Sequence, residues 1–204
     1  MGNIDLKSVS AQYMDVLREI GNIGAGNATT GLDSMLQCRI DMNFPEVKLI
    51  EVDELAESLG GSQRVMTAIF LEVEGDITGD IIFLLEQGSA RFLVSKLMGM
   101  EVSGDFGEME LSCIKEISNI IAGSYLNSLS TLTNLKIYPS VPHLQMDMVE
   151  TILHTPAKEN GAENDQILFI QTEFKDDIQL GGYFVMIPDT ESYGKILGAL
   201  GITL

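Results

Sequence analysis

Residues 15–36 of the 204-residue chain read DVLREIGNIGAGNATTGLDSML, and residues 112–132 read SCIKEISNIIAGSYLNSLSTL. Aligned at an offset of 97 residues, the two stretches share identical residues that include Glu19 with Glu116, Asn22 with Asn119, Gly26 with Gly123, and Leu32 with Leu129. Self-similarity at a fixed spacing is the sequence signature of a repeated structural unit. The chain is therefore predicted to be an internal duplication.

A second pair of similar stretches lies further along each half. Residues 68–85, AIFLEVEGDITGDIIFLL, are similar to residues 169–187, FIQTEFKDDIQLGGYFVMI. An amphipathic stretch that ends in Gly follows each of them, and no clear interdomain linker separates the halves. These observations predict a single domain over residues 1–204, made of two repeats at about 8–105 and 106–204.

Each half has the pattern of a long helix, an extended segment after a Pro, a pair of strands and a shorter helix. In the first half these elements are expected at residues 9–37, 45–52, 65–74, 79–85 and 89–98. In the second half they are expected at 110–132, 142–150, 166–174, 181–187 and 190–200, with a loop at 158–165. Closely spaced strands favour antiparallel pairing. The predicted fold is α+β with pseudo-two-fold symmetry, in which antiparallel β-strands pack with two long helices that carry the repeated residues.

Both long helices are expected to present one polar and one apolar side. Residues advance about 100° along a helix, so positions three or four apart share a side. The polar sides carry Asp15, Glu19 and Asn22 in the first helix and Ser112, Glu116 and Asn119 in the second. The apolar sides, which are expected to face the core, carry Tyr13, Leu17, Ile20 and Ile23 in the first helix and Ile114, Ile117, Ile120 and Ile121 in the second.

Small residues follow the repeated Asn in both helices. They are Gly24, Ala25 and Gly26 in the first helix and Ala122 and Gly123 in the second. Gly within a helix costs roughly 0.5 to 1 kcal/mol relative to Ala, so a packing reason is expected for it, such as the close approach of another backbone. An exposed Glu and Asn three residues apart are usually only solvated. Here the same Glu and Asn recur in the second helix beside the same small residues. This recurrence favours a function, because two helix faces that are only solvated would have no common reason to carry the same residues.

The composition argues against several classes of function. Thirty acidic against 12 basic residues give a formal net charge of −18, which disfavours binding to nucleic acid and to anionic membranes. The two cysteines, Cys38 and Cys113, and the two histidines, His143 and His154, match no metal-ligand spacing. The sequence shows no export signal, no apolar run of roughly 20 residues and no nucleotide-binding loop. We expect a cytoplasmic protein with no cofactor of its own and no membrane insertion.

The repeated residues resemble the motif of the CheC, CheX and FliY phosphatase family. That motif consists of Asp or Ser, three residues, Glu, two residues, Asn, a spacer of twenty-two residues and Pro. The first repeat matches it with Asp15, Glu19, Asn22 and Pro45, and the second repeat with Ser112, Glu116, Asn119 and Pro142. With two motifs in one chain, the sequence is most similar to the CheC members of the family.

The resemblance implies a chemotaxis enzyme that hydrolyses the aspartyl phosphate of the response regulator CheY. It implies that Glu19, Asn22, Glu116 and Asn119 dock on phosphorylated CheY, which supplies the Mg²⁺ and the phosphoaspartate. A neutral amide can hold the attacking water without bringing negative charge to the phosphate. Each Glu is expected to pair with a Lys of CheY, and general-base action is the alternative.

The other motif residues are expected to support the site. Pro45 and Pro142 are expected to fix the entry to a strand, while Asp15 and Ser112 either support docking or are only helix neighbours. The resemblance also implies binding to the receptor deamidase CheD. Residues 193–204 are one candidate surface for CheD, and burial in the core is the other explanation of their apolar character. A non-catalytic module that binds phospho-CheY or CheD is the alternative function, and a structural subunit of a chemotaxis complex is a third.

Overall fold

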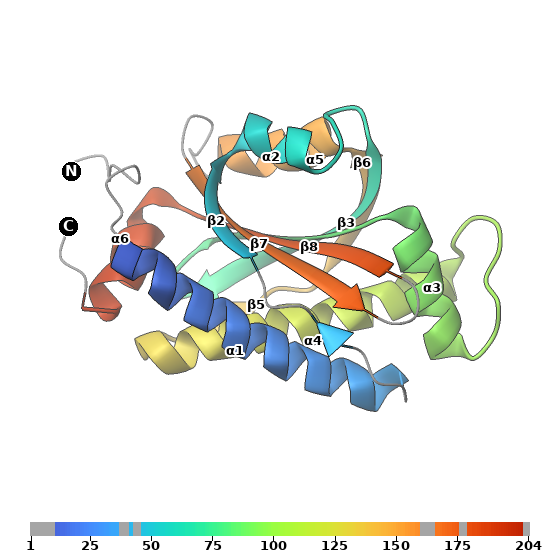
Figure 1. The fold of residues 1–204 in the computed structure, drawn as a ribbon, viewed down its shortest axis with the longest axis horizontal. Helices are drawn as coiled ribbons and strands as arrows, with labels where there is room; N and C mark the ends of the chain where they lie inside the picture. Colours follow the sequence, from blue (N-terminus) through green and yellow to red (C-terminus); the bar gives the residue numbers. More distant parts are fainter. Residues whose placement is uncertain (1–10, 37–40, 43–45, 160–165, 176–178, 202–204) are drawn as a thin grey trace.

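The computed structural model of the chain describes residues 11–36, 41–42, 46–159, 166–175 and 179–201 (Figure 1). The elements in chain order are α1 (Ala11–Leu36), β1 (Asp41–Met42), β2 (Glu46–Glu51), α2 (Val52–Ser58), β3 (Val65–Gly75), β4 (Gly79–Leu85), α3 (Gln87–Met98), α4 (Glu108–Thr133), β5 (Ile137–Pro139), β6 (His143–Met148), α5 (Val149–Glu159), β7 (Gln166–Lys175), β8 (Gln179–Pro188) and α6 (Thr190–Ala199). The elements from α4 onward repeat the order of those from α1 to α3. Both ends of α4 lie 97 residues after the corresponding ends of α1, which is the offset found in the sequence.

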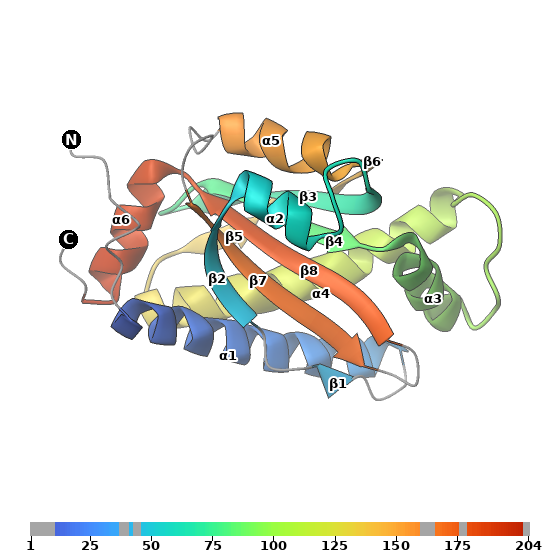
Figure 2. The same ribbon diagram turned by 45° about the horizontal axis from the view of Figure 1, so that its top comes forward.

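The strands form one sheet that has helices on both faces. The long helices α1 and α4 lie side by side and antiparallel along one face, and the short helices α2 and α5 cover the other (Figure 1, Figure 2). The core between the sheet and the long helices includes Phe83, Ile117 and Phe184. A second core, between the sheet and the short helices, includes Leu55 and Ile152. The long helices thus each have one side in the core and one side facing outward.

The eight-stranded sheet interleaves strands from the two halves of the chain. Its order is β1-β7-β8-β4-β3-β5, with β2 also on β7 and β6 also on β3, and every pair is antiparallel. At the centre β4 of the first half pairs with β8 of the second, and Ile82 lies opposite Val185. On the outer side of each hairpin, β3 pairs with β5 and β6, and β7 pairs with β1 and β2. The two halves of the chain therefore share one sheet.

The predicted α+β class, the antiparallel sheet and the two long helices are confirmed by the structure. The duplication and its pseudo-two-fold symmetry stay an interpretation of the sequence, which the repeated order of elements supports. The sequence does not predict α2 and α5, whose first residues belong to the extended segments expected at 45–52 and 142–150. Short helices form only when tertiary packing stabilises them, and here the sheet does so. Lys158 and Glu159 of the expected loop belong to α5, and residues 160–165 lie outside the described residues.

Small residues allow α1 and α4 to pack at close range. A Cβ on Gly24 would lie 2.6 Å from Cδ1 of Tyr125, and a Cβ on Gly31 would lie 2.6 Å from Cγ2 of Ile120. The ring of Tyr125 in turn stacks on Phe184 of β8, with 4.3 Å between the ring centroids. Gly24 therefore has the packing reason that the sequence predicts.

The buried side of α1 differs from the predicted one at Ile23. Ile20 is 5% exposed, as expected for the core, but Ile23 is 36% exposed. The core side of α1 is lined instead by Ala25, Ala28 and Leu32. Because each residue advances about 100° around the helix axis, Ala25, Ala28 and Leu32 lie to one side of Ile20 and Ile23 lies to the other. The prediction for Ile23 is therefore wrong.

The predicted apolar side of α4 does face the core. Ile114, Ile117 and Ile121 are at most 1% exposed, and Ile120 packs against the same cluster. The side chains of Tyr13 and Leu17, which are predicted to do the same in α1, lie outside the described residues.

Candidate functional site

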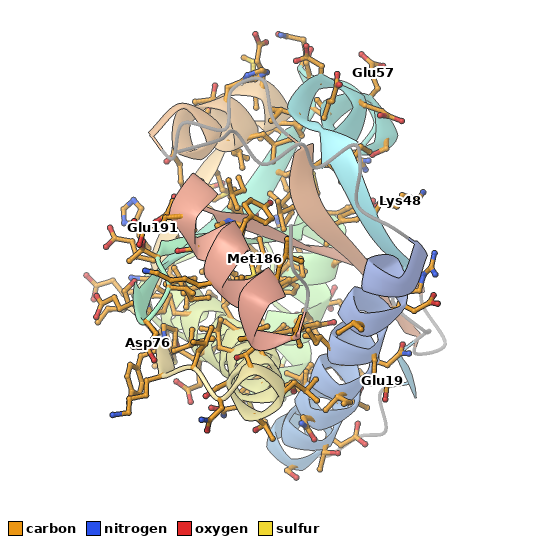
Figure 3. The ribbon with its side chains drawn as sticks, turned by 90° about the vertical axis from the view of Figure 1, so that its left-hand side faces the viewer. Glu19, Lys48, Glu57, Asp76, Met186 and Glu191 are labelled. Carbon is orange, nitrogen blue, oxygen red and sulfur yellow. The ribbon has the colours of Figure 1, made fainter. Side chains whose placement is uncertain are left out.

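The first motif lies on the outward side of α1. Asp15 and Glu19 are exposed and Asn22 is partly buried, and Glu19 projects from the helix in Figure 3. Arg18 Nη1 donates a hydrogen bond of 2.8 Å to Asp15 Oδ1, which makes an ion pair three residues apart on the helix. In the described part of the chain, the side chain of Glu19 has no ion-pair or hydrogen-bond partner. Its carboxylate is therefore available to another molecule.

The second motif repeats this arrangement on α4. Ser112 and Glu116 are exposed, and Asn119 is partly buried. Ser112 has no carboxylate, so it cannot form with Lys115 the ion pair that Asp15 forms with Arg18. No side-chain partner of Glu116 occurs among the residues that the structure describes. The three helical residues of each motif therefore lie along one side of their helix, and the Glu has no described partner.

Local contacts fix the two ends of α4 and join α4 to α1. At the start of α4 the Gly107 N–H donates to Glu110 Oε2 over 3.0 Å, and the helix ends at Asn134, whose φ is 56°. Such a left-handed residue is a common helix terminus. Between the helices, Asn27 Nδ2 donates to Ser128 Oγ over 3.3 Å. The motif side chains thus project from helices that are held in place along the sheet.

The two motifs form separate sites. Because α1 and α4 are antiparallel, each motif lies beside the C-terminal half of the other helix (Figure 1). Gly24, near Asn22, contacts Tyr125, whereas Gly31 contacts Ile120, which is next to Asn119. Gly24 and Gly31 are about 10 Å apart along the axis of α1 at 1.5 Å per residue.

The two prolines of the motif precede strands. Pro142 is buried and stands directly before β6, a position where its missing N–H is tolerated. This location agrees with the expected role of Pro142 in strand entry. Pro45 stands directly before β2 in the sequence but lies outside the described residues.

Each motif offers one carboxylate and one carboxamide on an open helix surface. The carboxamide of Asn can both accept and donate hydrogen bonds, and an ionised Glu can pair with a cation. Small-molecule sites are concave and enclose most of their ligand, whereas a helix face is convex. Groups on such a face are therefore suited to a second macromolecule that brings its own cleft.

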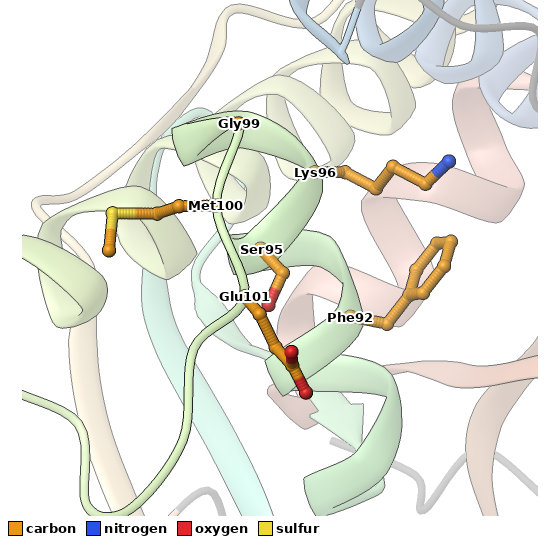
Figure 4. A pocket seen from close by; sticks show the side chains of 6 residues that line it. All are labelled: Phe92, Ser95, Lys96, Gly99, Met100 and Glu101. Atoms are coloured by element: carbon orange, nitrogen blue, oxygen red, sulfur yellow. The ribbon is translucent and has the colours of Figure 1, made fainter.

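The described part of the chain contains no group of three His, Cys, Asp or Glu side chains placed to hold a metal ion. Within the same residues, no helix is both long enough and apolar enough to cross a membrane. A shallow depression of about 330 Å³ lies at the C-terminal end of α3 (Figure 4), lined by Phe92, Ser95, Lys96, Gly99, Met100 and Glu101. None of these residues belongs to the motifs.

Two features of the motif helices are absent from the sequence predictions. The first is the ion pair between Arg18 and Asp15, for which opposite charges three residues apart were an available signal. The second is open space at Gly26 and Gly123, where an added Cβ would meet no atom within 4 Å. The sequence shows that Gly26 recurs as Gly123 whereas Gly24 has Ile121 as its counterpart, but it does not show that Gly24 contacts Tyr125 while the other two glycines face open space.

Comparison with known proteins identifies relatives along almost the whole chain. A model of the CheC-like family matches residues 14–49 and 109–145, the stretches that contain the two motifs. The chain is 35% identical over 204 residues to CheY-P phosphatase CheC of Bacillus subtilis (strain 168). The aligned region covers 96% of this chain and 97% of that protein.

Two solved structures have a similar fold. The X-ray crystal structure of Thermotoga maritima FliY has a TM-score of 0.77 at 20% sequence identity, with 95% of this chain and 98% of that chain covered. The crystal structure of the CheX-CheY-BeF3-Mg+2 complex from Borrelia burgdorferi has a TM-score of 0.52 at 18% identity, with 81% of this chain and 96% of that chain covered. At these identities the structures show a common fold alone.

Membership of a family rests on the sequence. An identity of 35% over nearly the full length of both proteins is accompanied by a family match at both motif-bearing helices. The recurrence of the motif at one offset and the antiparallel pair of helices that present it agree with that match. The chain therefore belongs to the CheC-like family.

Proposed function

We propose that this chain is a protein phosphatase of chemotaxis that hydrolyses the aspartyl phosphate of CheY. The observation that carries the proposal is the recurrence of an exposed Glu and a partly buried Asn, three residues apart, on the outward sides of α1 and α4. The relative that is 35% identical is named a CheY-P phosphatase. A convex surface with these groups is suited to a protein substrate that supplies the cleft.

Asn22 and Asn119 are proposed to position the attacking water. An aspartyl phosphate is an acyl phosphate with a good leaving group, so its hydrolysis needs a water held in line with phosphorus more than a strong base. The carboxamide oxygen accepts a hydrogen bond from this water. The water oxygen then bonds to phosphorus while the bond between phosphorus and the Asp oxygen breaks. The products are the free carboxylate and dihydrogen phosphate, which keeps both hydrogens of the water, one of them transferred to a phosphoryl oxygen, and then exchanges a proton with solvent.

Glu19 and Glu116 are proposed to dock the partner. A carboxylate close to a phosphoryl group would be repelled unless a cation neutralises it. Both carboxylates are exposed and have no described partner within the chain, so each can pair with a Lys of CheY near the phosphorylation site. This pairing fixes the register in which the neighbouring Asn reaches the water.

The metal of the reaction is proposed to belong to CheY. The described residues include no cluster of ligands for a metal ion. The structural neighbour CheX is crystallised with CheY, BeF3 and Mg+2. Mg²⁺ bound by CheY neutralises the charge that develops on the phosphoryl oxygens.

CheD is retained as a second proposed partner, on the family resemblance alone. The apolar side of α6, within the candidate segment 193–204, is accounted for by core packing, because Ile196 and Leu197 are 5% and 4% exposed. Residues 202–204 lie outside the described residues. No surface for CheD is assigned.

The proposal is tested by measuring phosphate release from phosphorylated CheY. Replacing Asn22 and Asn119 with Ala is expected to remove the acceleration while CheY still binds. The alternative function, a module that binds phospho-CheY without hydrolysis, requires instead that the parent chain itself gives no acceleration. These two outcomes separate an enzyme from a binding module.

A further inference from the structure

Two helical glycines of the motif faces have no packing reason inside the protein. Gly26 lies in the interior of α1 and Gly123 in the interior of α4, at equivalent positions of the two repeats. A Cβ added to either of them would meet no atom within 4 Å. Gly is less favourable than Ala within a helix because it loses more backbone freedom on folding. Each long helix therefore keeps a destabilising residue that its own packing does not require.

Two other glycines of α1, Gly24 and Gly31, behave differently. At Gly24 an added Cβ would meet the ring of Tyr125, and at Gly31 it would meet Ile120, in both cases at 2.6 Å. Close packing of α1 and α4 accounts for these two positions. Close packing does not explain Gly26 and Gly123, and their recurrence at one offset beside the two motifs favours a reason outside the chain.

Gly26 and Gly123 adjoin the proposed catalytic groups. Gly26 is four residues after Asn22 and seven after Glu19, so all three share one side of α1, a turn apart. Gly123 has the same relation to Asn119 and Glu116 on α4. An Asn side chain is short, and its amide can enter the cleft of a partner only when the helix backbone comes close to that partner. A side chain one turn further along the same face would keep the helix backbone at a greater distance from the partner.

We propose that Gly26 and Gly123 set the distance of closest approach between the motif helices and phosphorylated CheY, and so act as specificity-determining positions beside each Asn. This inference rests on the proposed function of the chain. The missing Cβ atoms leave room for the partner's surface to lie against the helix backbone. They act by permitting the docked geometry in which Asn22 or Asn119 reaches the water, and they take no part in the chemistry.

The test uses the full chain with Gly26→Ala and Gly123→Ala, singly and together. The double variant is expected to keep its circular-dichroism spectrum and to unfold at the same or a higher temperature, because Ala favours a helix. At the same time kcat/KM for phospho-CheY is expected to fall by about tenfold, the cost of one or two methyl groups forced into a packed contact. A rise in stability together with a loss of activity is not expected from a merely structural role.

Gly88→Ala in α3 and Gly198→Ala in α6 are the matched controls. Both glycines are exposed and helical, and an added Cβ meets nothing within 4 Å. These controls are expected to leave kcat/KM unchanged. An unchanged kcat/KM in the folded Gly26/Gly123 double variant overturns the inference.

Parallel variants at Asn22 and Asn119 separate this inference from the proposed function. If the Asn variants lose activity and the Gly variants do not, the inference fails and the phosphatase proposal stands. If neither set loses activity, the inference fails together with the proposed role of the two Asn residues, while the chain is still a phosphatase. Binding of CheD or of a second copy that is weakened by Gly→Ala, with kcat/KM for phospho-CheY intact, assigns the open face to that partner and also overturns the inference.

Discussion

The backbone of α1 at Gly24 lies directly against the ring of Tyr125, since a Cβ at this position would be 2.6 Å from Cδ1 of the ring. Tyr125 cannot move away freely, because its ring is buried and also stacks on Phe184 in the sheet. The contact thus links the first motif helix to the second and both of them to the sheet.

The first prediction is that Gly24→Ala destabilises the protein. The added methyl group collides with a held ring, and overpacking of this kind costs about 1–3 kcal/mol. Gly26→Ala, two residues away in open space, is the control and is expected to be neutral or stabilising by up to about 1 kcal/mol. Urea unfolding followed by circular dichroism measures both. Equal free energies of unfolding for the two variants would show that the packing of α1 on Tyr125 is described wrongly.

The second prediction concerns the cap of α6. Asp189 Oδ1 accepts a hydrogen bond of 2.7 Å from the Ser192 N–H, and its other oxygen accepts from the Thr78 hydroxyl. The carboxylate therefore joins the turn before β4 to the start of α6. Asp189→Ala is expected to lower the free energy of unfolding by about 1–2 kcal/mol, the usual effect of losing an N-cap. A change below the error of denaturant unfolding would mean that this cap contributes nothing.

The third prediction is a pH dependence that arises from the same residue. Partial burial acts to raise the pKa of Asp189, but hydrogen bonds from Thr78 and Ser192 outweigh it and hold the pKa below its usual value. A carboxyl group with a lowered pKa stabilises the fold at pH values above the pKa of the unfolded chain, about 3.9 for Asp. That stabilisation is lost as the pH falls through the lower, folded-state pKa.

Asp189→Asn isolates this effect, because Asn can still cap a helix but does not titrate in this range. We expect the free energy of unfolding to fall less steeply below about pH 4 in Asp189→Asn than in the parent chain. If the free energy of unfolding changes with pH in the same way for the two proteins between pH 3 and 6, the Asp189 carboxylate does not contribute to the pH dependence of stability.

The fourth prediction is that charge reversal at the two motif carboxylates weakens docking. Glu19→Lys with Glu116→Lys places a positive charge where a Lys of CheY is proposed to bind, so the affinity for phosphorylated CheY is expected to fall by roughly tenfold. The loss should shrink at high salt, because exposed charges are screened. Isothermal titration at two ionic strengths measures both effects.

Glu57→Lys is the matched control for the charge reversal. Glu57 is an exposed carboxylate on α2, which covers the opposite face of the sheet (Figure 1, Figure 3). Glu57→Lys changes the net charge by the same amount as Glu19→Lys or Glu116→Lys alone. If Glu57→Lys weakens binding as much as Glu19→Lys alone, the effect comes from the overall charge of the protein and specific pairing at the motif is excluded.

The fifth prediction is that Asp15 is a helix neighbour and makes no contact with CheY. Its carboxylate is already paired with Arg18, and both side chains are more than half exposed. Exposed ion pairs contribute about 0–1 kcal/mol. Asp15→Ser, which copies Ser112 into the first motif, is expected to change the unfolding free energy by less than about 1 kcal/mol and to leave CheY affinity within experimental error. A clear loss of affinity would assign Asp15 to docking.

Much of this fold follows from sequence because the repeat and the helical period are strong signals. The offset of 97 residues places both ends of α4 correctly relative to α1, and the Glu and Asn of each motif do share an exposed face. The short helices α2 and α5 do not follow in the same way. Their buried residues, such as Leu55 and Ile152, are held by a sheet that assembles from strands distant in the sequence.

The remaining differences arise where packing between helices decides the outcome. Ile23 fits an apolar period but turns away from the core, because α1 approaches α4 through Gly24 and Gly31 and faces the sheet through small residues. Whether a helical Gly serves packing inside the chain or leaves space for another molecule depends on three-dimensional neighbours. The sequence shows that Gly26 recurs as Gly123 and that Gly24 does not recur, but only the structure shows that Gly24 packs on Tyr125 while Gly26 faces open space.

The central claim is that Asn22 and Asn119 hold the water that attacks the phosphoaspartate of CheY. Its most direct test is the rate of phosphate release from phospho-CheY with Asn22→Ala, Asn119→Ala and both together, alongside the affinity of each variant for CheY that carries beryllofluoride and Mg²⁺. We predict a partial loss of rate in each single variant and, in the double variant, a fall of about 100-fold or to the rate of CheY alone, with affinity retained. Hydrolysis by a double variant at the rate of the parent chain would contradict the account.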